Sequence, residues 1–139
     1  MIEKFFEHIK KEEGFREKAY WDEKHWSIGY GTSSFEGEVI SEREAERRMK
    51  LKAEHIWTAD FYRLPIKNHN EIGTFRKLAL CSMIYQMGLR GVGTFKKMLK
   101  AIDEKDWVTA YNEARDSLWH KQTPARAEIV ANIIKDGVL

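Results

Sequence analysis

The chain has 139 residues, which is enough for one compact domain or for two small lobes that share a core. It is 42% hydrophobic and 33% charged, a composition typical of an ordinary soluble globular protein. Lys and Arg (24) nearly balance Asp and Glu (22), which argues against a nucleic-acid-binding protein because that class usually carries a stronger basic surface. The 17 aromatic residues (five Trp, five Tyr and seven Phe) argue against disorder.

The single cysteine and the histidines exclude two kinds of site. Cys81 has no partner for an internal disulfide, and its apolar neighbours favour a buried thiol. The histidines show no metal-ligand spacing, so we expect neither a metal nor another cofactor.

No segment is long and apolar enough to be inserted in a membrane, and the first residues are charged throughout, unlike a secretory signal peptide. We therefore expect a protein made in the cytoplasm of its host, which reaches any target outside only after another agent opens the membrane.

The first third of the chain predicts one helix and a short β-hairpin. Apolar residues recur at helical spacing at Ile2, Phe5, Phe6 and Ile9. This spacing predicts an amphipathic helix over residues 2–12 that stops at Gly14. Strand-forming residues between 18 and 31, interrupted by a turn at 23–25, predict the hairpin.

The remainder of the chain is predicted to be helical. Ser41 and Glu44 have the spacing of a capping box, which begins a long polar helix that runs to about residue 61. Residues 72–87 are apolar nearly all round, which indicates a buried central helix closed by Gly88. Further helices are expected over 94–102, 106–116 and 124–135.

These elements predict a predominantly helical α+β fold. A small β-hairpin lobe and a helical lobe would be joined by the long polar helix, which is of the kind that bridges two lobes through solvent. We expect one domain over residues 1–139. Within it, residues 13–60 would form the small lobe with the connecting helix, and residues 1–12 and 61–139 would form the helical lobe.

Two acidic residues have the chemistry that cleavage of a glycosidic bond requires. Glu13 continues the apolar stripe of the first helix, where partial dehydration favours a general acid. A solvated carboxylate at a frayed helix end is the alternative. Asp22 follows the first hairpin strand and can supply the second carboxylate, although aspartate is also a common turn residue.

Several motifs resemble those of the phage lysozymes. They are Glu13-Gly14-x-Arg16, Tyr20-x-Asp22, Trp26-Ser27-Ile28-Gly29-Tyr30-Gly31, Ile40-Ser41-x-x-Glu44-Ala45-Glu46, Tyr85-Gln86-Met87-Gly88, Gly91-Val92-x-x-Phe95 and Trp119-x-x-Gln122-Thr123-Pro124-x-Arg126-Ala127. The likeness covers nearly the whole chain in the family's order. It implies a lysozyme-like fold and a muramidase, an endolysin that cuts the β-1,4 bond between N-acetylmuramic acid and N-acetylglucosamine in peptidoglycan for host cell lysis.

The resemblance also implies the catalytic roles. Glu13 takes the position of the acid and Asp22 that of the opposing carboxylate, with eight residues between them as in the family. The family inverts the anomeric centre, which requires carboxyl groups about 6.5–9.5 Å apart to hold a water. Ser27 takes the position of a threonine whose hydroxyl helps to hold that water.

Two departures from the family pattern fall in the small lobe. Only four residues, 23–26, separate Asp22 from Ser27, where the family has five. The shorter turn can displace either residue, so Glu23 is the reserve candidate for the second carboxylate. The stretch over residues 32–39 is also short, which should weaken substrate binding or broaden specificity.

The helical lobe supplies the expected substrate-binding residues. The resemblance pairs Arg126 with Glu13, whereas a plain surface arginine is the alternative. Gln86 interrupts an apolar helix, and its amide needs partners, which sugar hydroxyls or nearby backbone can provide. Tyr85 can offer a ring face to a sugar. Thr123 matches a residue of the family's cleft, although N-capping of the last helix explains it equally well.

The expected partner is therefore the peptidoglycan glycan strand, bound by a monomer. The main alternative is a catalytically weakened relative that binds glycan without cutting it. A helical interaction module without any glycan role is a further alternative.

Overall fold

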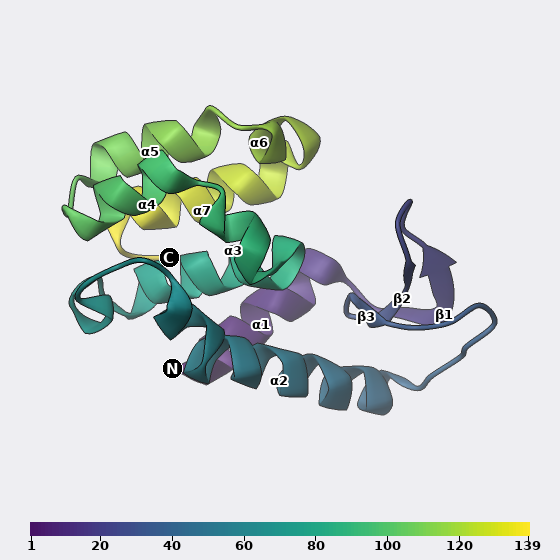
Figure 1. Cartoon of the computed structure of the whole chain (residues 1–139). Helices are drawn as coiled ribbons and strands as arrows, with labels where there is room; N and C mark the ends of the chain where they lie inside the picture. Colours follow the sequence, from purple (N-terminus) through teal and green to yellow (C-terminus); the bar gives the residue numbers. More distant parts are fainter. The chain divides into compact units, whose positions relative to one another are not determined.

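The computed structural model describes all 139 residues and divides into two compact units, Met1–His55 and Ile56–Leu139. Seven α-helices and a three-stranded antiparallel sheet confirm the predicted helical α+β class (Figure 1). None of the helices has both the length and the apolar character to cross a lipid bilayer. The first helix groups with the sheet by its contacts, whereas the sequence-based division assigned residues 1–12 to the helical lobe.

Helix α1 (Ile2–Glu13) opens the first unit and forms where the apolar spacing predicted a helix. Phe5 and Ile9 are its fully buried side chains. Gly14 ends the helix with φ of 67°, a left-handed value that glycine adopts without strain, and its N–H donates to the Lys10 carbonyl.

The sheet follows, with strands β1 (Arg16–Trp21), β2 (Trp26–Gly29) and β3 (Thr32–Ser33) in that spatial order. The sequence predicted two strands and extended the second to Gly31. In the structure Gly29 (φ 62°) and Gly31 (φ 79°) instead reverse the chain and add β3. A strand of two residues is too short to show an alternating pattern, which is why the sequence did not reveal it.

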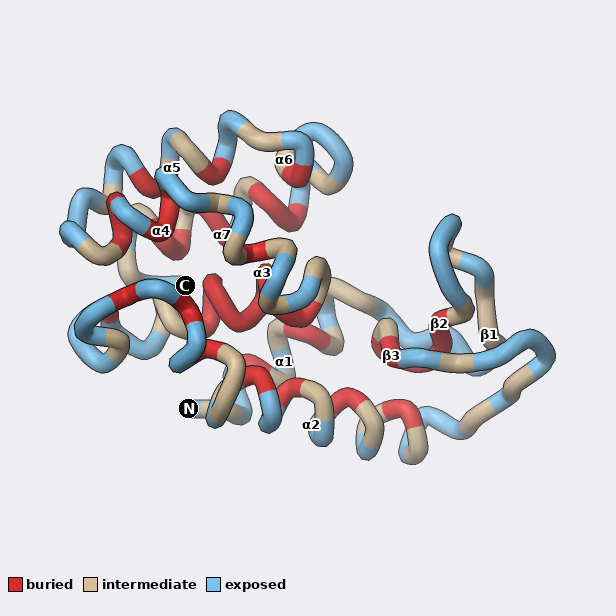
Figure 2. Tube along the Cα trace, in the orientation of Figure 1, coloured by how far each residue is buried: buried red, intermediate tan, exposed pale blue.

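Helix α2 (Glu42–Thr58) has the narrow buried side that its polar sequence predicted. Its buried residues are Ala45, Met49, Ala53 and Ile56, and buried stretches recur along the helix in Figure 2. The helix was expected to reach residue 61 but stops three residues earlier. A single 3₁₀ turn, η1 (Asp60–Arg63), then precedes Pro65.

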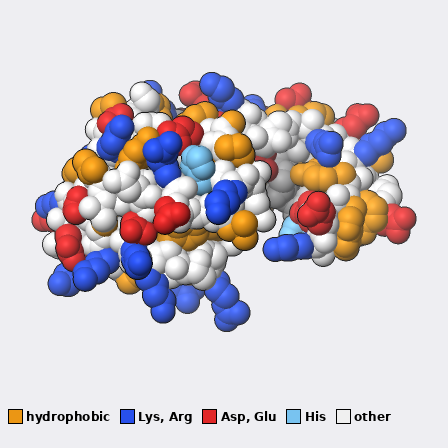
Figure 3. Space-filling model, turned by 90° about the horizontal axis from the view of Figure 1, so that it is seen from above, with side chains coloured by type: hydrophobic (Ala, Val, Ile, Leu, Met, Phe, Trp, Pro, Cys, Tyr) orange, Lys and Arg blue, Asp and Glu red, His pale blue; other side chains and the backbone are white.

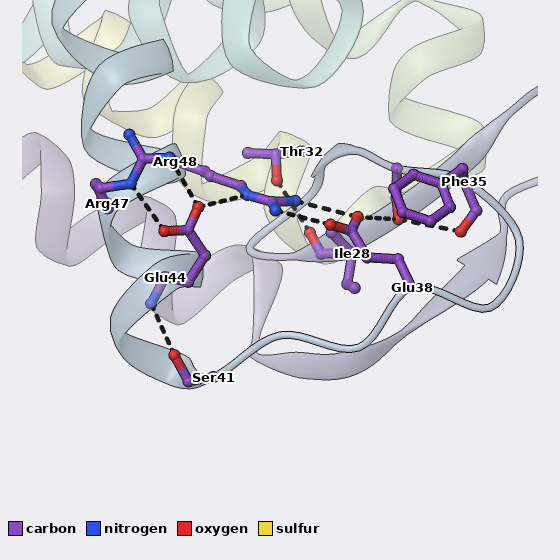
Figure 4. A network of polar contacts seen from close by, with 9 residues as sticks. Ile28, Thr32, Phe35, Glu38, Ser41, Glu44, Arg47 and Arg48 are labelled. Atoms are coloured by element: carbon purple, nitrogen blue, oxygen red, sulfur yellow. Dashed lines mark hydrogen bonds and ion pairs between the residues drawn. The ribbon is translucent and has the colours of Figure 1, made fainter.

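A charged network fixes the loop before α2 (Figure 4). The Glu44 N–H donates to Ser41 Oγ at 3.1 Å, as the capping box predicted. The Glu44 carboxylate accepts from Arg47 and Arg48, and these guanidinium groups lower its pKa to about 2. Arg48 also donates to Glu38 at 2.7 Å, so one side chain connects the loop with the first turns of the helix.

The second unit is built around α3 (Thr74–Gly93), the central helix that the sequence predicted. Every residue from Leu78 to Tyr85 is buried. Gly88 leaves helical geometry with φ of 81° and ψ of 163°, after which the helix resumes for one more turn. The predicted stop at Gly88 is therefore a kink within a longer element.

Four more helices complete this unit, and α7 packs against α3, α5 and α6. Together with a short 3₁₀ turn, they are η2 (His69–Glu71), α4 (Lys96–Asp103), α5 (Trp107–Arg115), α6 (Leu118–Gln122) and α7 (Pro124–Asp136). Three of these helices match the predicted ranges to within two residues. The sequence missed α6 because five residues are too few to show helical periodicity.

Two properties of the composition have a direct structural counterpart. Cys81 is fully buried, and this burial raises the pKa of its thiol far above the usual range, so the thiol is inert at neutral pH. Both signs of charge are spread over the face of the molecule shown in Figure 3.

The close contact between Gly29 and Ala45 predicts that a side chain at position 29 destabilises the fold. A β-carbon there would lie 2.8 Å from Ala45 Cβ, in a left-handed conformation. We expect Gly29→Ala to lower the free energy of unfolding in urea by about 2–4 kcal/mol. The matched variant is Gly37→Ala, because Gly37 has φ of 87° and no atom near its missing β-carbon. It should lose only about 1 kcal/mol, and an equal loss would contradict the packing argument.

Candidate active site

Glu13 is the last residue of α1, and its carboxylate lies directly against the backbone of Gly31. A β-carbon on Gly31 would be 2.5 Å from Glu13 Oε1 and 3.1 Å from Cδ, closer than such atoms can approach. Gly31 also has a positive φ. The turn between β2 and β3 thus presents backbone without a side chain to the carboxylate, and Glu13 is half-buried.

Lys52 approaches the same turn from α2. Its Nζ donates to the Gly31 carbonyl at 3.3 Å. Lys52 was not among the predicted site residues, because a lysine on a polar helix gives no signal of a contact with a residue 21 positions away. The end of α1 and the middle of α2 therefore both bring a charged side chain to Gly31.

Asp22 lies at the start of the β1–β2 turn, with its carboxylate held by backbone and side-chain donors. Oδ1 accepts the N–H groups of Lys24 (3.1 Å) and His25 (2.9 Å). Oδ2 accepts from Ser27 Oγ at 2.8 Å and lies 2.8 Å from His25 Nδ1. These donors, led by the His25 N–H, lower the pKa of Asp22, which keeps the group ionised.

Ser27 is brought to Asp22 despite the shortened turn. Its side chain is buried on β2, with an exposed fraction of 4%. The turn closes with Glu23 in a left-handed conformation (φ 80°) and a hydrogen bond from the Asp22 N–H to the His25 carbonyl. Glu23, the reserve candidate, is exposed in this turn, whereas Asp22 holds the bond to Ser27.

Tyr20 interacts electrostatically with both candidate carboxylates. It pairs with Ser27 across the β1–β2 ladder, so both side chains lie on one face of the sheet. Burial raises the pKa of the Tyr20 hydroxyl, and the negative charges of Glu13 and Asp22 raise it further. The Tyr20 hydroxyl is therefore under the electrostatic influence of both carboxylates. Tyr20 was not among the predicted site residues.

In the second unit three residues form a closed polar network. Gln86 Nε2 donates to Thr123 Oγ1 at 3.1 Å, and Trp119 Nε1 donates to Gln86 Oε1 at 2.9 Å. Thr123 Oγ1 donates to the Trp119 carbonyl at 3.2 Å and makes no capping bond to α7. Thr123 therefore stands at the predicted N-cap position of α7, but its hydroxyl does not cap the helix. Trp119 is the member that the sequence analysis did not assign.

Arg126 and Tyr85 are both buried within the second unit. Arg126 Nη2 donates to the carbonyl (3.3 Å) and to Oγ (3.2 Å) of Ser82, so the alternative of a plain surface arginine is wrong. Tyr85 has an exposed fraction of 3%. The ion pair between Glu13 and Arg126 would join the two units and stays a prediction, as does the contact of Tyr85 with a sugar.

No group of three or more His, Cys, Asp and Glu side chains is arranged to hold a metal ion. The candidate site residues can perform acid–base chemistry. Glu13 lies beside the backbone of a glycine turn, and Asp22 is surrounded by hydrogen-bond donors.

Comparison with known proteins identifies the family. The phage lysozyme family matches residues 10–132. The chain is 34% identical to the pre-baseplate central spike protein Gp5 of Enterobacteria phage T4, over 96% of this chain but only 28% of that protein. It is 34% identical to probable T4-type lysozyme 1 of Dictyostelium discoideum, over 94% of this chain and 71% of that protein. It is also 42% identical to probable T4-type lysozyme 2 of that organism, over 51% of this chain and 42% of that protein. The chain therefore belongs to the phage lysozyme family of glycoside hydrolases.

Proposed function

We propose that this chain is a muramidase that hydrolyses the β-1,4 bond between N-acetylmuramic acid and N-acetylglucosamine in peptidoglycan, with inversion at the anomeric carbon. Glu13 is the general acid, Asp22 the general base and Ser27 the residue that holds the attacking water. The observation that carries the proposal is the placement of two carboxylates on the same small sheet: Glu13 lies against Gly31, just after β2, and Asp22 accepts the hydroxyl of Ser27 on β2. Hydrolysis of a glycoside requires two carboxylates.

The environments of the two carboxylates support this division of roles. Asp22 is surrounded by donors that stabilise its charged form, which suits a base. Glu13 lies at the end of an apolar helix stripe and against a glycine backbone, where its carboxyl group is partly dehydrated. Environments that differ in this way assign different roles to two chemically similar groups.

In the proposed reaction, Glu13 gives its proton to the oxygen of the leaving sugar as the glycosidic bond breaks. A water held by Ser27 attacks the anomeric carbon from the opposite face and loses a proton toward Asp22. Ser27 Oγ already donates its hydrogen to Asp22, so its lone pairs are available to accept one from this water. At the end of the reaction Glu13 is ionised and Asp22 is protonated.

The alternative of a weakened relative that binds glycan without cutting it was suggested by the short turn and by serine in place of threonine. The 2.8 Å bond between Ser27 and Asp22 argues against it, since the lost residue has not separated the pair. Host cell lysis after membrane release, and the monomeric state, stay predictions.

Removal of the acid should abolish most of the activity. Glu13→Gln keeps the side-chain shape but lacks the transferable proton, and we expect the rate of peptidoglycan solubilisation to fall about 10²–10⁴-fold. Glu12→Gln, next to it in α1, serves as the matched control and should retain the wild-type rate. Equal rates for wild type and Glu13→Gln would refute the proposed function.

A second variant tests the position of the acid rather than its chemistry. Gly31→Ala places a methyl group on the Glu13 carboxylate, which lies at the end of a flexible side chain and can move away. Gly31→Ala should therefore lose only the strain cost of a left-handed alanine. This cost is about 1 kcal/mol of unfolding free energy, as in Gly37→Ala. The activity of Gly31→Ala should fall at least about tenfold, since small misplacements of a catalytic group are costly. Full activity would show that the carboxylate is not needed at Gly31.

The stereochemistry of the product tests the assignment of Asp22 as base. Inversion of a β-1,4 bond releases the α-anomer first, which ¹H NMR of a fresh digest detects before mutarotation. An initial β-anomer would mean that Asp22 attacks the sugar directly, against the role proposed here.

A further inference from the structure

Lys52 occupies a position of α2 where the helix otherwise carries apolar side chains. It follows Met49 by three residues and Ala45 by seven, and both of these residues are buried. Side chains at these spacings lie on one face of a helix, so Lys52 belongs to the buried side of α2. Lys52 is itself half-buried. A lysine on a buried face loses part of its hydration, a cost that an apolar side chain would avoid.

The ammonium group of Lys52 is bound by the turn between β2 and β3. Its Nζ donates to the Gly31 carbonyl at 3.3 Å. The preceding residue of the turn, Tyr30, is held by α2 as well, since its hydroxyl donates to Glu42 Oε1 at 2.9 Å. Helix α2 therefore contacts two successive residues of this turn, and the contact made by Lys52 is the one at Gly31.

The Glu13 carboxylate lies against the same residue that Lys52 holds. A β-carbon on Gly31 would be 2.5 Å from Glu13 Oε1, so the carboxylate is in contact with the turn at this point. Gly31 has no side chain and a φ of 79°, and glycine backbone has more conformational freedom than that of any other residue. A hydrogen bond from a separate helix to its carbonyl restricts the orientation of the peptide group that follows.

We propose that Lys52 is a positioning residue for the general acid. It holds the peptide group after Gly31, and the turn in this orientation fixes the Glu13 carboxylate relative to the oxygen of the leaving sugar. In this role Lys52 neither contacts the sugar nor exchanges a proton. The role explains why a lysine is present on the buried side of α2. This inference rests on the proposed function, in which Glu13 is the acid.

The first experiment compares stability with activity in Lys52→Met. Methionine is unbranched, of similar length and suited to a buried face. The variant should keep a urea midpoint at or above that of wild type, because no ammonium group is then dehydrated. Its kcat on solubilised peptidoglycan fragments should fall about three- to tenfold with KM unchanged, because the acid is less well placed.

Three results of this experiment would overturn the proposal. One is a kcat equal to that of wild type. Another is a lower urea midpoint together with a lower kcat, since a merely structural role moves stability and activity in the same direction. The third is a raised KM with unchanged kcat, which would place Lys52 in contact with the substrate instead.

Two matched variants identify the group that is responsible. Lys52→Arg keeps a side-chain donor of similar reach and should recover kcat to within about twofold of wild type. Lys50→Met removes an exposed lysine of the same helix, whose Nζ lies 3.2 Å from Glu46, and should keep the wild-type kcat because exposed ion pairs contribute little. Equal losses of kcat in Lys52→Arg and Lys52→Met, or in Lys50→Met and Lys52→Met, would contradict the positioning role.

Combination with Gly31→Ala tests whether Lys52 acts through the turn. Both changes are expected to displace the Glu13 carboxylate from the same place, so their effects on kcat are not independent. The fall in kcat of the double variant should be smaller than the product of the two single falls. A fall equal to that product, or larger, would mean that Lys52 acts by another route, against the proposal.

Failure of this inference is distinguishable from failure of the proposed function. If the enzymatic proposal is wrong, Glu13→Gln has the same activity as wild type. If only the role of Lys52 is wrong, Glu13→Gln is inactive while Lys52→Met gives one of the three contrary results above.

Discussion

The close approach of the Glu13 carboxylate to the backbone of Gly31 is the constraint on which the candidate site depends. It fixes the end of α1 against the turn between β2 and β3, and it requires a residue without a side chain at position 31. The same backbone carbonyl receives Lys52 from α2. Two helices and the sheet of the first unit therefore meet at one glycine.

The second carboxylate is positioned by a different physical means. Asp22 begins a four-residue turn and accepts hydrogen bonds from the backbone of that turn, which is the usual behaviour of aspartate at such a site. Its other oxygen, Oδ2, accepts from Ser27 Oγ and lies 2.8 Å from His25 Nδ1. The turn-forming and catalytic interpretations of Asp22 are thus compatible, because one oxygen stabilises the turn while the other faces the proposed chemistry.

Elements with a strong local periodicity were predicted correctly from the sequence. Elements that are too short to show a period, and contacts between distant residues, were not. The apolar spacing of α1 and the continuous apolar run of α3 gave their positions closely. By contrast, β3 and α6 are too short to carry a period. Thr123 is the N-cap residue of α7 as its local sequence predicted, yet its hydroxyl hydrogen-bonds to Gln86 and to the Trp119 carbonyl instead of capping the helix. A side chain with two possible partners cannot be assigned from its neighbours in sequence.

The sequence by itself determined the fold class, the family resemblance and the identity of Glu13, Asp22 and Ser27 as candidates, because motif spacing and residue chemistry are properties of the chain alone. Only the tertiary structure decided that the shortened turn keeps Ser27 at hydrogen-bond distance from Asp22, and that both acids act electrostatically on Tyr20. These facts depend on distances of a few ångströms between side chains on different strands and turns. Such distances are set by backbone conformation, including the left-handed Glu23 and Gly31, which no spacing rule specifies.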